Sequence, residues 1–282
     1  MLFGGARALL MQAAHPLVVA GANQTAMYER NPWKRLQRTL VLTYTVTFGT
    51  KAEADAAAAA INEVHTRING VDPITGKSYD ALDPELLLYV HACLVDSALL
   101  FEELTVGALD DDGRERFHRE QMLAAEMVLI PREIIPPTVP ALRAWLADID
   151  DRGDLLVTDG ARRVYELFLD PPREAEWRPI LPLVSRLAFG TLPPTLREAY
   201  GIPMSATKRA AMRATFAAIR AGRPSLPARF RYVALYHEWL RRERGLEPRL
   251  DLRGMRRSLG IRLGAAQRAE PEAHTEPPGP AR

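Results

Sequence analysis

The sequence predicts an all-α protein, and three observations support this prediction. Alanine and leucine are abundant, strand-like alternation of apolar and polar residues is rare, and apolar residues recur with the 3.6-residue period of a helix. With 282 residues, 47% of them hydrophobic, the chain is long enough to bury a substantial core. We expect one globular domain over residues 1–250, then a basic segment and a disordered tail over residues 251–282.

The first helix is expected over Gly5–Val19, with a break near Pro16, because the proline ring clashes with the carbonyl group four residues earlier. A second long helix should run from Pro32 to Phe48. Asn31 precedes it as a cap, and proline is favoured at the first helical position. Gly49 should end this helix.

A third helix is predicted over Lys51–Ile68, with a narrow buried stripe on one face formed by Ile61, Val64, His65 and Ile68. A turn-rich loop follows over Asn69–Leu82, and no segment of the chain predicts a convincing strand. Asp83, Pro84 and Glu85 then mark the start of a fourth helix that reaches about Leu104. This helix is apolar around most of its circumference and is therefore expected at the centre of the protein, with His91 inside it.

The remaining chain predicts a series of shorter helices separated by proline-rich connections. We expect them at about Gly113–Met127, Pro140–Asp148, Asp154–Leu169, Arg173–Ala188, Pro194–Tyr200, Ser205–Ala221 and Pro227–Arg244.

Composition excludes several classes of protein. The net charge is only +2 and the charges are interspersed through most of the chain, so no nucleic-acid partner is implied. The single cysteine, Cys93, excludes an internal disulfide framework and multi-cysteine metal sites, and cytoplasm is the default location. No run of 18 apolar residues predicts a membrane span. The sequence is still compatible with peripheral contact with a membrane. The oligomeric state cannot be predicted.

The first residues do not have the pattern of a secretion signal, because Gln12 and His15 interrupt the apolar stretch from Ala8 to Ala22. The chain begins almost inside a helix, at Met1-Leu2-Phe3-Gly4-Gly5, so we expect an upstream segment to be absent from this sequence.

Polar residues on the second helix form a candidate site. Arg35 and Thr39 are four residues apart and project from one helix face, and Arg38 lies beside them. This arrangement is suited to holding an anion or a polarised oxygen atom. It is equally consistent with a solvated basic face for which Glu29 supplies the counter-charge.

Three histidines lie in apolar surroundings. His65 and His91 each occupy a helix face, and from sequence alone each is more typical of a hydrogen-bonded core residue than of a metal ligand. His15 precedes Pro16, where the broken helix leaves carbonyl groups that its ring could satisfy. All three could line one pocket.

The Arg35-x-x-Arg38-Thr39 helix, followed by His65 and the turn Asn69-Gly70-Val71-Asp72-Pro73, resembles the rubber oxygenase (latex-clearing protein) and mycophenolic-pathway oxygenase family, whose known members bind haem b. The resemblance covers Gly4 to about Pro248. It implies a single multi-helix domain with a buried haem pocket and globin-like helix packing.

By this resemblance His65 is the axial ligand of the haem iron. His91 is its main competitor because its helix is expected to be the more buried one, and His15 is a further candidate for the haem pocket. Arg35, Arg38 and Thr39 correspond to the family's distal residues, where a cation holds a propionate or stabilises negative charge on bound dioxygen. The family's catalytic glutamate has no counterpart in the region from Val18 to Gln24, and Glu29 is the nearest acid.

A competing metal site is suggested by Glu115 and His118, which form a Glu-x-x-His pair on one helix. A carboxylate-bridged di-iron centre needs a second such pair, and the sequence has none. Glycine-rich nucleotide-binding motifs and the Gly-x-Ser-x-Gly motif of hydrolases are also absent.

The sequence therefore favours a haem-dependent oxygenase that acts with dioxygen on an apolar substrate, such as a prenyl chain or another alkene. Two alternatives stay open. One is a helical protein that binds haem or lipid without turnover, and the other is a purely structural helical module.

Overall fold

The computed structural model describes residues 2–24, 32–173, 175, 178–247, 249–250, 254, 256, 258–259 and 261. The predicted cap Asn31, the acid Glu29 and the predicted tail lie outside the described residues. Within them, the all-α prediction is confirmed: helices account for nearly all of the regular structure, and the one exception is a short hairpin of two strands.

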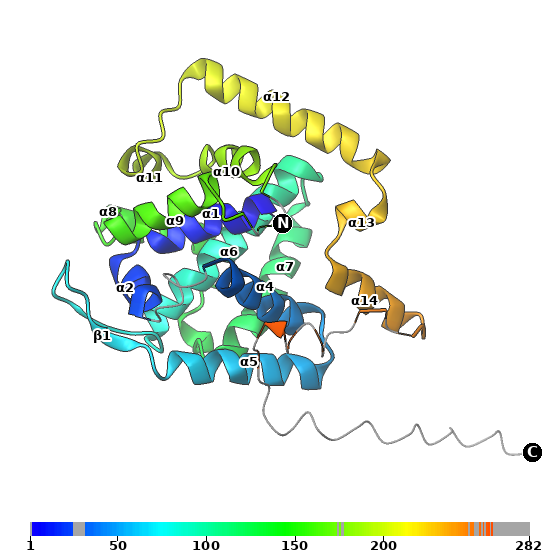
Figure 1. The fold of residues 1–282 in the computed structure, drawn as a ribbon, viewed down its shortest axis with the longest axis horizontal. Helices are drawn as coiled ribbons and strands as arrows, with labels where there is room; N and C mark the ends of the chain where they lie inside the picture. Colours follow the sequence, from blue (N-terminus) through cyan, green and yellow to red (C-terminus); the bar gives the residue numbers. More distant parts are fainter. Residues whose placement is uncertain are drawn as a thin grey trace, which may run out of the picture.

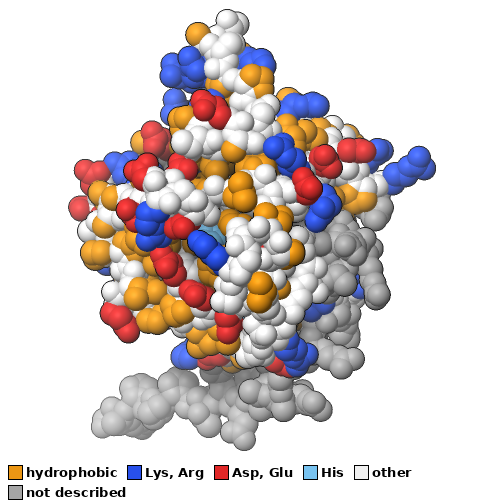
Figure 2. Space-filling view, turned by 90° about the vertical axis from the view of Figure 1, so that its left-hand side faces the viewer, with side chains coloured by type: hydrophobic (Ala, Val, Ile, Leu, Met, Phe, Trp, Pro, Cys, Tyr) orange, Lys and Arg blue, Asp and Glu red, His pale blue; other side chains and the backbone are white. Residues whose placement is uncertain are grey.

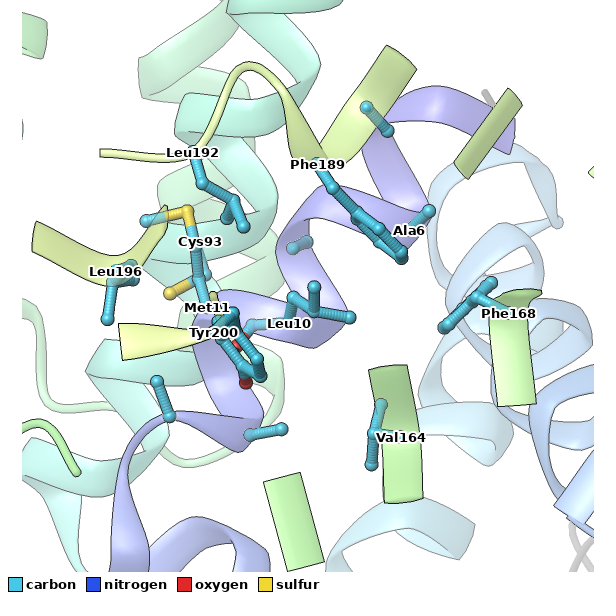
Figure 3. Packing of buried hydrophobic residues seen from close by; sticks show 14 of the residues in the cluster. Ala6, Leu10, Met11, Cys93, Val164, Phe168, Phe189, Leu192, Leu196 and Tyr200 are labelled. Atoms are coloured by element: carbon cyan, nitrogen blue, oxygen red, sulfur yellow. The ribbon is translucent and has the colours of Figure 1, made fainter. Parts of the chain in front are cut away.

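The centre of the molecule is α6 (Pro84–Thr105), as its apolar circumference predicted. Asp83 caps it by accepting hydrogen bonds from the amides of Glu85 and Leu86. α1 (Leu2–Ala13) packs along α6, and α9 (Asp159–Leu169) and α10 (Leu181–Phe189) cover the other side of α1. Figure 3 shows Ala6 and Leu10 of α1 among side chains from α9 and α10. α6 is long and apolar enough to cross a membrane, but its central packing explains that composition.

The predicted break at Pro16 is confirmed, because α1 ends at Ala13 and α2 (Pro16–Gln24) begins at the proline. Other groups satisfy the carbonyl oxygens at this break. The Tyr89 hydroxyl donates to Met11, the Tyr200 hydroxyl donates to Leu10, and the amide of Leu156 donates to Ala14. The prediction that the His15 ring would satisfy them is therefore wrong.

The next two helices, α4 (Pro32–Phe48) and α5 (Lys51–His65), form an antiparallel helical hairpin. Its closed end lies at Gly49 and Thr50, where Thr50 and Glu53 form a reciprocal capping box. The predicted buried stripe of α5 is partly wrong. Val64 is 45% exposed and His65 is half-buried, because the helix buries its alanine face, at Ala54, Ala57 and Ala58, against its neighbours.

A small antiparallel hairpin of β1 (Asn69–Val71) and β2 (Ser78–Asp80) replaces the structureless loop that the sequence predicted. Its turn is organised by Asp72, which accepts hydrogen bonds from the backbone amide and the hydroxyl of Thr75, and by Gly76, which adopts a positive φ of 70°. The strands are three residues each, too short for alternation to be visible in the sequence.

Four elements lie between α6 and α10. They are α7 (Asp111–Met127), the 3-10 helix η1 (Arg132–Ile134), α8 (Val139–Asp151) and α9. α9 begins five residues later than predicted. The preceding residues form an extended connection that binds the break after α1, and Thr158 caps the helix. α10 likewise lacks its predicted first half, since Pro182 favours the first turn of a helix.

The chain then passes through α11 (Pro194–Ala199), α12 (Ala206–Gly222), η2 (Arg223–Ser225), α13 (Ala228–Arg231) and α14 (Ala234–Glu243). The single helix predicted over Pro227–Arg244 is split by extended backbone at Tyr232. α12 lies along one edge of the molecule, and the chain returns through α13 to place α14 beside α4 (Figure 1). In Figure 2 acidic, basic and hydrophobic side chains are mixed over most of the visible face, with basic ones at the projecting tip.

Candidate functional site

The candidate site lies at the open end of the α4–α5 hairpin. Because the two helices run antiparallel from their closed end at Gly49, the beginning of α4 lies near the end of α5. Arg35 is in the first turn of α4 and His65 is the last residue of α5. The two side chains are close enough to interact, since the positive charge of Arg35 contributes to lowering the pKa of His65.

Arg35, Arg38 and Thr39 share one side of α4, as the spacing predicted. The Thr39 hydroxyl donates a hydrogen bond to the Arg35 carbonyl oxygen at 3.1 Å, which fixes the threonine side chain against the preceding turn. Arg35 and Arg38 are half-buried and Thr39 is exposed. This side of the helix therefore offers two cations and one hydroxyl to whatever lies at the opening.

His65 has a buried ring nitrogen without a partner and a lowered pKa. Its Nδ1 atom is buried and has no hydrogen-bond partner. Burial, with a smaller contribution from Arg35, lowers the pKa of His65 below its usual value. The imidazole is therefore neutral at pH 7, and neutral imidazole is the form that coordinates a metal.

Two further residues at this end of the hairpin escaped the sequence analysis. The Nε1 atom of Trp33, in the first turn of α4, is buried without a partner. The Oδ1 atom of Asn62 is also buried without a partner, while its Nδ2 donates to the Met127 carbonyl oxygen at 3.0 Å. The signal for Asn62 was its spacing, because it lies one turn before His65 on the same helix face.

Such atoms are concentrated at the open end of the hairpin but not confined to it, because five of the eight among the described residues lie elsewhere, at His15, His91, His118, Ser185 and Arg231. A buried polar atom without a hydrogen bond costs about 1–3 kcal/mol, so native structures contain few of them. Trp33, Asn62 and His65 place three such atoms on one short hairpin. The arrangement is typical of a site whose polar groups are satisfied by a ligand.

His15 lies in a different neighbourhood, against α6. Its ring is 5.2 Å from the ring of Tyr89, and its Nδ1 atom is buried without a partner. Burial lowers the pKa of His15, although Asp154 and Glu85 oppose this effect. His15 is therefore placed by the break between α1 and α2 rather than by the hairpin.

His91 faces another direction again. Tyr89 and His91 are two residues apart on α6, so their side chains leave the helix on nearly opposite sides. His91 is buried beside His118 of α7, its Nε2 atom has no partner, and burial together with His118 lowers its pKa to about 4. The interpretation that His15, His65 and His91 line one pocket is not supported, since each lies among different neighbours.

The Glu115–His118 pair has a structural role. Glu115 accepts a hydrogen bond from the amide of Val139 at the start of α8, and the Nε2 atom of His118 bonds the Pro136 carbonyl oxygen at 2.8 Å. Both side chains thus attach α7 to the segment that leads into α8. Neither is directed at a shared metal position.

Among the described residues, no three His, Cys, Asp or Glu side chains lie close enough to bind a metal ion together. A haem needs less from the protein, because the porphyrin supplies four nitrogen ligands and one axial side chain can suffice. His65 fits that role by its neutral, unpartnered ring, and the two arginines of α4 fit the carboxylates of haem propionates.

The fold and the site define an all-helical protein in which a histidine at the end of α5 lies near Arg35 of α4, at the open end of a helical hairpin. A model of the catalytic domain of the ER-bound oxygenase mpaB/B' and rubber oxygenase matches residues 1–221. The chain belongs to this family, which is defined by an oxygenase catalytic domain.

Two curated relatives come from mycobacteria. The uncharacterized proteins Mb2261 of Mycobacterium bovis and Rv2237 of Mycobacterium tuberculosis are each 26% identical to this chain over 149 residues. The aligned part is 50% of this chain and 57% of each relative, so the chain spans little more than half the length of the proteins it matches. No solved structure matches the chain.

Proposed function

We propose that the chain is a haem-b-dependent oxygenase that uses dioxygen to oxidise an apolar, alkene-containing substrate, with its catalytic domain within residues 1–250. The observation that carries the proposal is the set of unpartnered buried polar atoms at the open end of the α4–α5 hairpin, where His65 lies near Arg35. Family membership supports the oxygenase class.

In this proposal His65 holds the iron and the bound haem supplies the activation of dioxygen. The neutral imidazole needs no deprotonation before it coordinates, because its pKa is already lowered. The hydrogen bond from the Thr39 hydroxyl to the Arg35 carbonyl oxygen holds the threonine side chain against α4.

Arg35 and Arg38 have one of two roles in the proposal. A guanidinium group binds a propionate carboxylate as a charge-assisted pair, or it stabilises negative charge that develops on oxygen during the reaction. Both roles require a cation at a partly water-excluded position, and both side chains are half-buried.

The described part of Val18–Gln24 contains no acid that could transfer a proton. The absence of an acid there favours a second candidate function, which is binding of haem or an apolar molecule without turnover. The two differ in whether a product forms only when dioxygen is present.

The test begins with expression of the parent and the His65→Ala variant under haem supplementation. The proposal predicts a Soret band in the parent that is lost or shifted in the variant, and a dioxygen-dependent product when prenyl alkenes are screened. A coloured parent that yields no product would support the binding protein. A colourless parent would overturn both haem interpretations.

A further inference from the structure

The C-terminal part of the chain is far more basic than the rest. Residues 203–262 contain 15 of the 37 lysines and arginines but only 4 of the 35 acidic residues. The described part of this region, from α12 to residue 250, forms what we call the basic arm. Such a concentration of positive charge attracts anionic surfaces over several ångströms of solution.

A pocket on the basic arm is lined mainly by basic side chains. It lies at α14, has a volume of about 330 Å³, and is lined by Arg241, Arg244, Arg249 and His237. Glu238 is its one acidic lining residue. That carboxylate is buried, and one of its oxygens accepts a hydrogen bond from the backbone amide of Arg249. The pocket therefore keeps a net positive charge.

The arginines of the pocket make few interactions with other protein groups. The Arg241 guanidinium donates to the Glu247 carbonyl oxygen, which fixes it at the pocket wall. None of the ion pairs among the described residues involves Arg241, Arg244 or Arg249. Arg242 of the arm differs, since it pairs with Glu53 of α5, as does Arg256 beyond the arm.

Apolar side chains border the pocket. Leu240 and Leu246 line it, and Leu246 is 48% exposed. Elsewhere on the arm Leu226 and the aromatic residues Tyr232 and Trp239 are also exposed. Arginine, leucine and amphipathic aromatic rings together are typical of a protein surface that lies at a membrane interface.

We propose that the basic arm docks on an anionic membrane, with a lipid phosphate bound in the α14 pocket and Leu246 inserted beside it. The exposed leucines favour a membrane over a nucleic acid, because a phosphodiester backbone offers no apolar layer to receive them. The proposal does not depend on the oxygenase chemistry.

The test is co-sedimentation of the full chain with vesicles of phosphatidylcholine alone or mixed with phosphatidylglycerol. We expect binding to the mixed vesicles only, weakened by added salt. The double variant Arg244→Gln/Arg249→Gln should weaken binding by roughly 30-fold, given the contribution of each arginine near an anionic surface. The Leu246→Ser variant should weaken it without changing the charge.

The matched control is Arg116→Gln/Arg119→Gln, which removes the same charge from exposed positions of α7 outside the basic arm, and circular dichroism checks that every variant is folded. An equal loss of vesicle binding in the control would contradict the role of the α14 pocket. Equal binding to neutral vesicles, or no binding of the parent, would overturn the docking surface. Tighter binding to RNA than to vesicles, or full competition by inorganic phosphate at millimolar concentration, would also overturn it.

Discussion

Most buried polar groups in the core around α1 have partners, with His15 and Ser185 as exceptions, whereas three at the open end of the α4–α5 hairpin have none. In the core, Arg7 is buried, pairs with Asp96 at 2.8 Å and donates to the Ser97 hydroxyl at 2.7 Å. The hydroxyl groups of Tyr89 and Tyr200 likewise find carbonyl partners. At the open end of the hairpin, Trp33, Asn62 and His65 each keep a buried polar atom without a partner.

Under the proposed function, the difference separates polar residues that stabilise the fold from polar residues that bind the haem. Removing a paired group from the core should cost folding stability. Removing an unpartnered group from the hairpin should cost little stability and should affect binding instead. Measurements of the free energy of unfolding in core and hairpin variants therefore test this difference.

The largest effect is expected for Arg7→Met. The change leaves Ser97 without its partner, and Asp96 then keeps only Arg143, so the free energy of unfolding should fall by about 3 kcal/mol in urea denaturation. The control Arg67→Ala removes an exposed pair with Glu63 and should leave the midpoint nearly unchanged. A loss as small as that of the control would show that the Arg7 network does not stabilise the core.

Acid should destabilise the protein through His91. Its pKa in the folded protein is about 4, below the value of about 6.5 for a free histidine, so the unfolded chain binds more protons between these values. Stability is full above pH 6.5 and falls as the pH drops toward 4, by about 2 kcal/mol at pH 5. His91→Gln should reduce this dependence. An unchanged pH profile in His91→Gln would contradict the assignment.

Gly49→Ala tests the closed end of the hairpin. A Cβ atom there would collide with the Thr45 carbonyl oxygen and lie 3.1 Å from the Glu53 side chain. We expect a loss of about 1–2 kcal/mol, and weaker haem binding because Arg35 and His65 move relative to each other. Gly107→Ala is the control, since a Cβ there meets nothing within 4 Å. If Gly49→Ala bound haem as the parent does, the geometry of the closed end would not control the site.

The smallest effect is expected for Arg35→Gln. Removal of its positive charge should raise the pKa of His65 modestly, while burial still keeps that pKa below the usual value. Titration of the histidine ring protons by NMR measures the change, and Arg67→Gln provides the control. A His65 pKa that stays constant would mean that Arg35 does not lie beside it.

Much of the helical pattern could be predicted from the sequence, because single residues decide it. Pro16 ends one helix and begins another, Asp83 and Pro84 start α6, and Gly49 ends α4. The errors occurred where tertiary contacts outweigh local pattern. Leu156 is extended because its amide binds the break after α1, and no periodicity in its own segment encodes that contact.

The site was predictable only in part for the same reason. The spacing of Arg35 and Thr39 places both on one side of α4, but that His65 approaches this side follows from the antiparallel packing of two helices. Likewise, His91 could not be separated from His65 by sequence, because both interrupt apolar helix faces. Packing separates them, since His91 faces His118.

The most direct test of the account is a haem titration of the apo protein, followed at the Soret band, for the parent, His65→Ala and His91→Ala. We expect His65→Ala to abolish or shift the band, while its free energy of unfolding stays within about 1 kcal/mol of the parent's. His91→Ala should bind haem as the parent does, although it is less stable. Normal haem binding by His65→Ala, or its loss only in His91→Ala, would contradict the account.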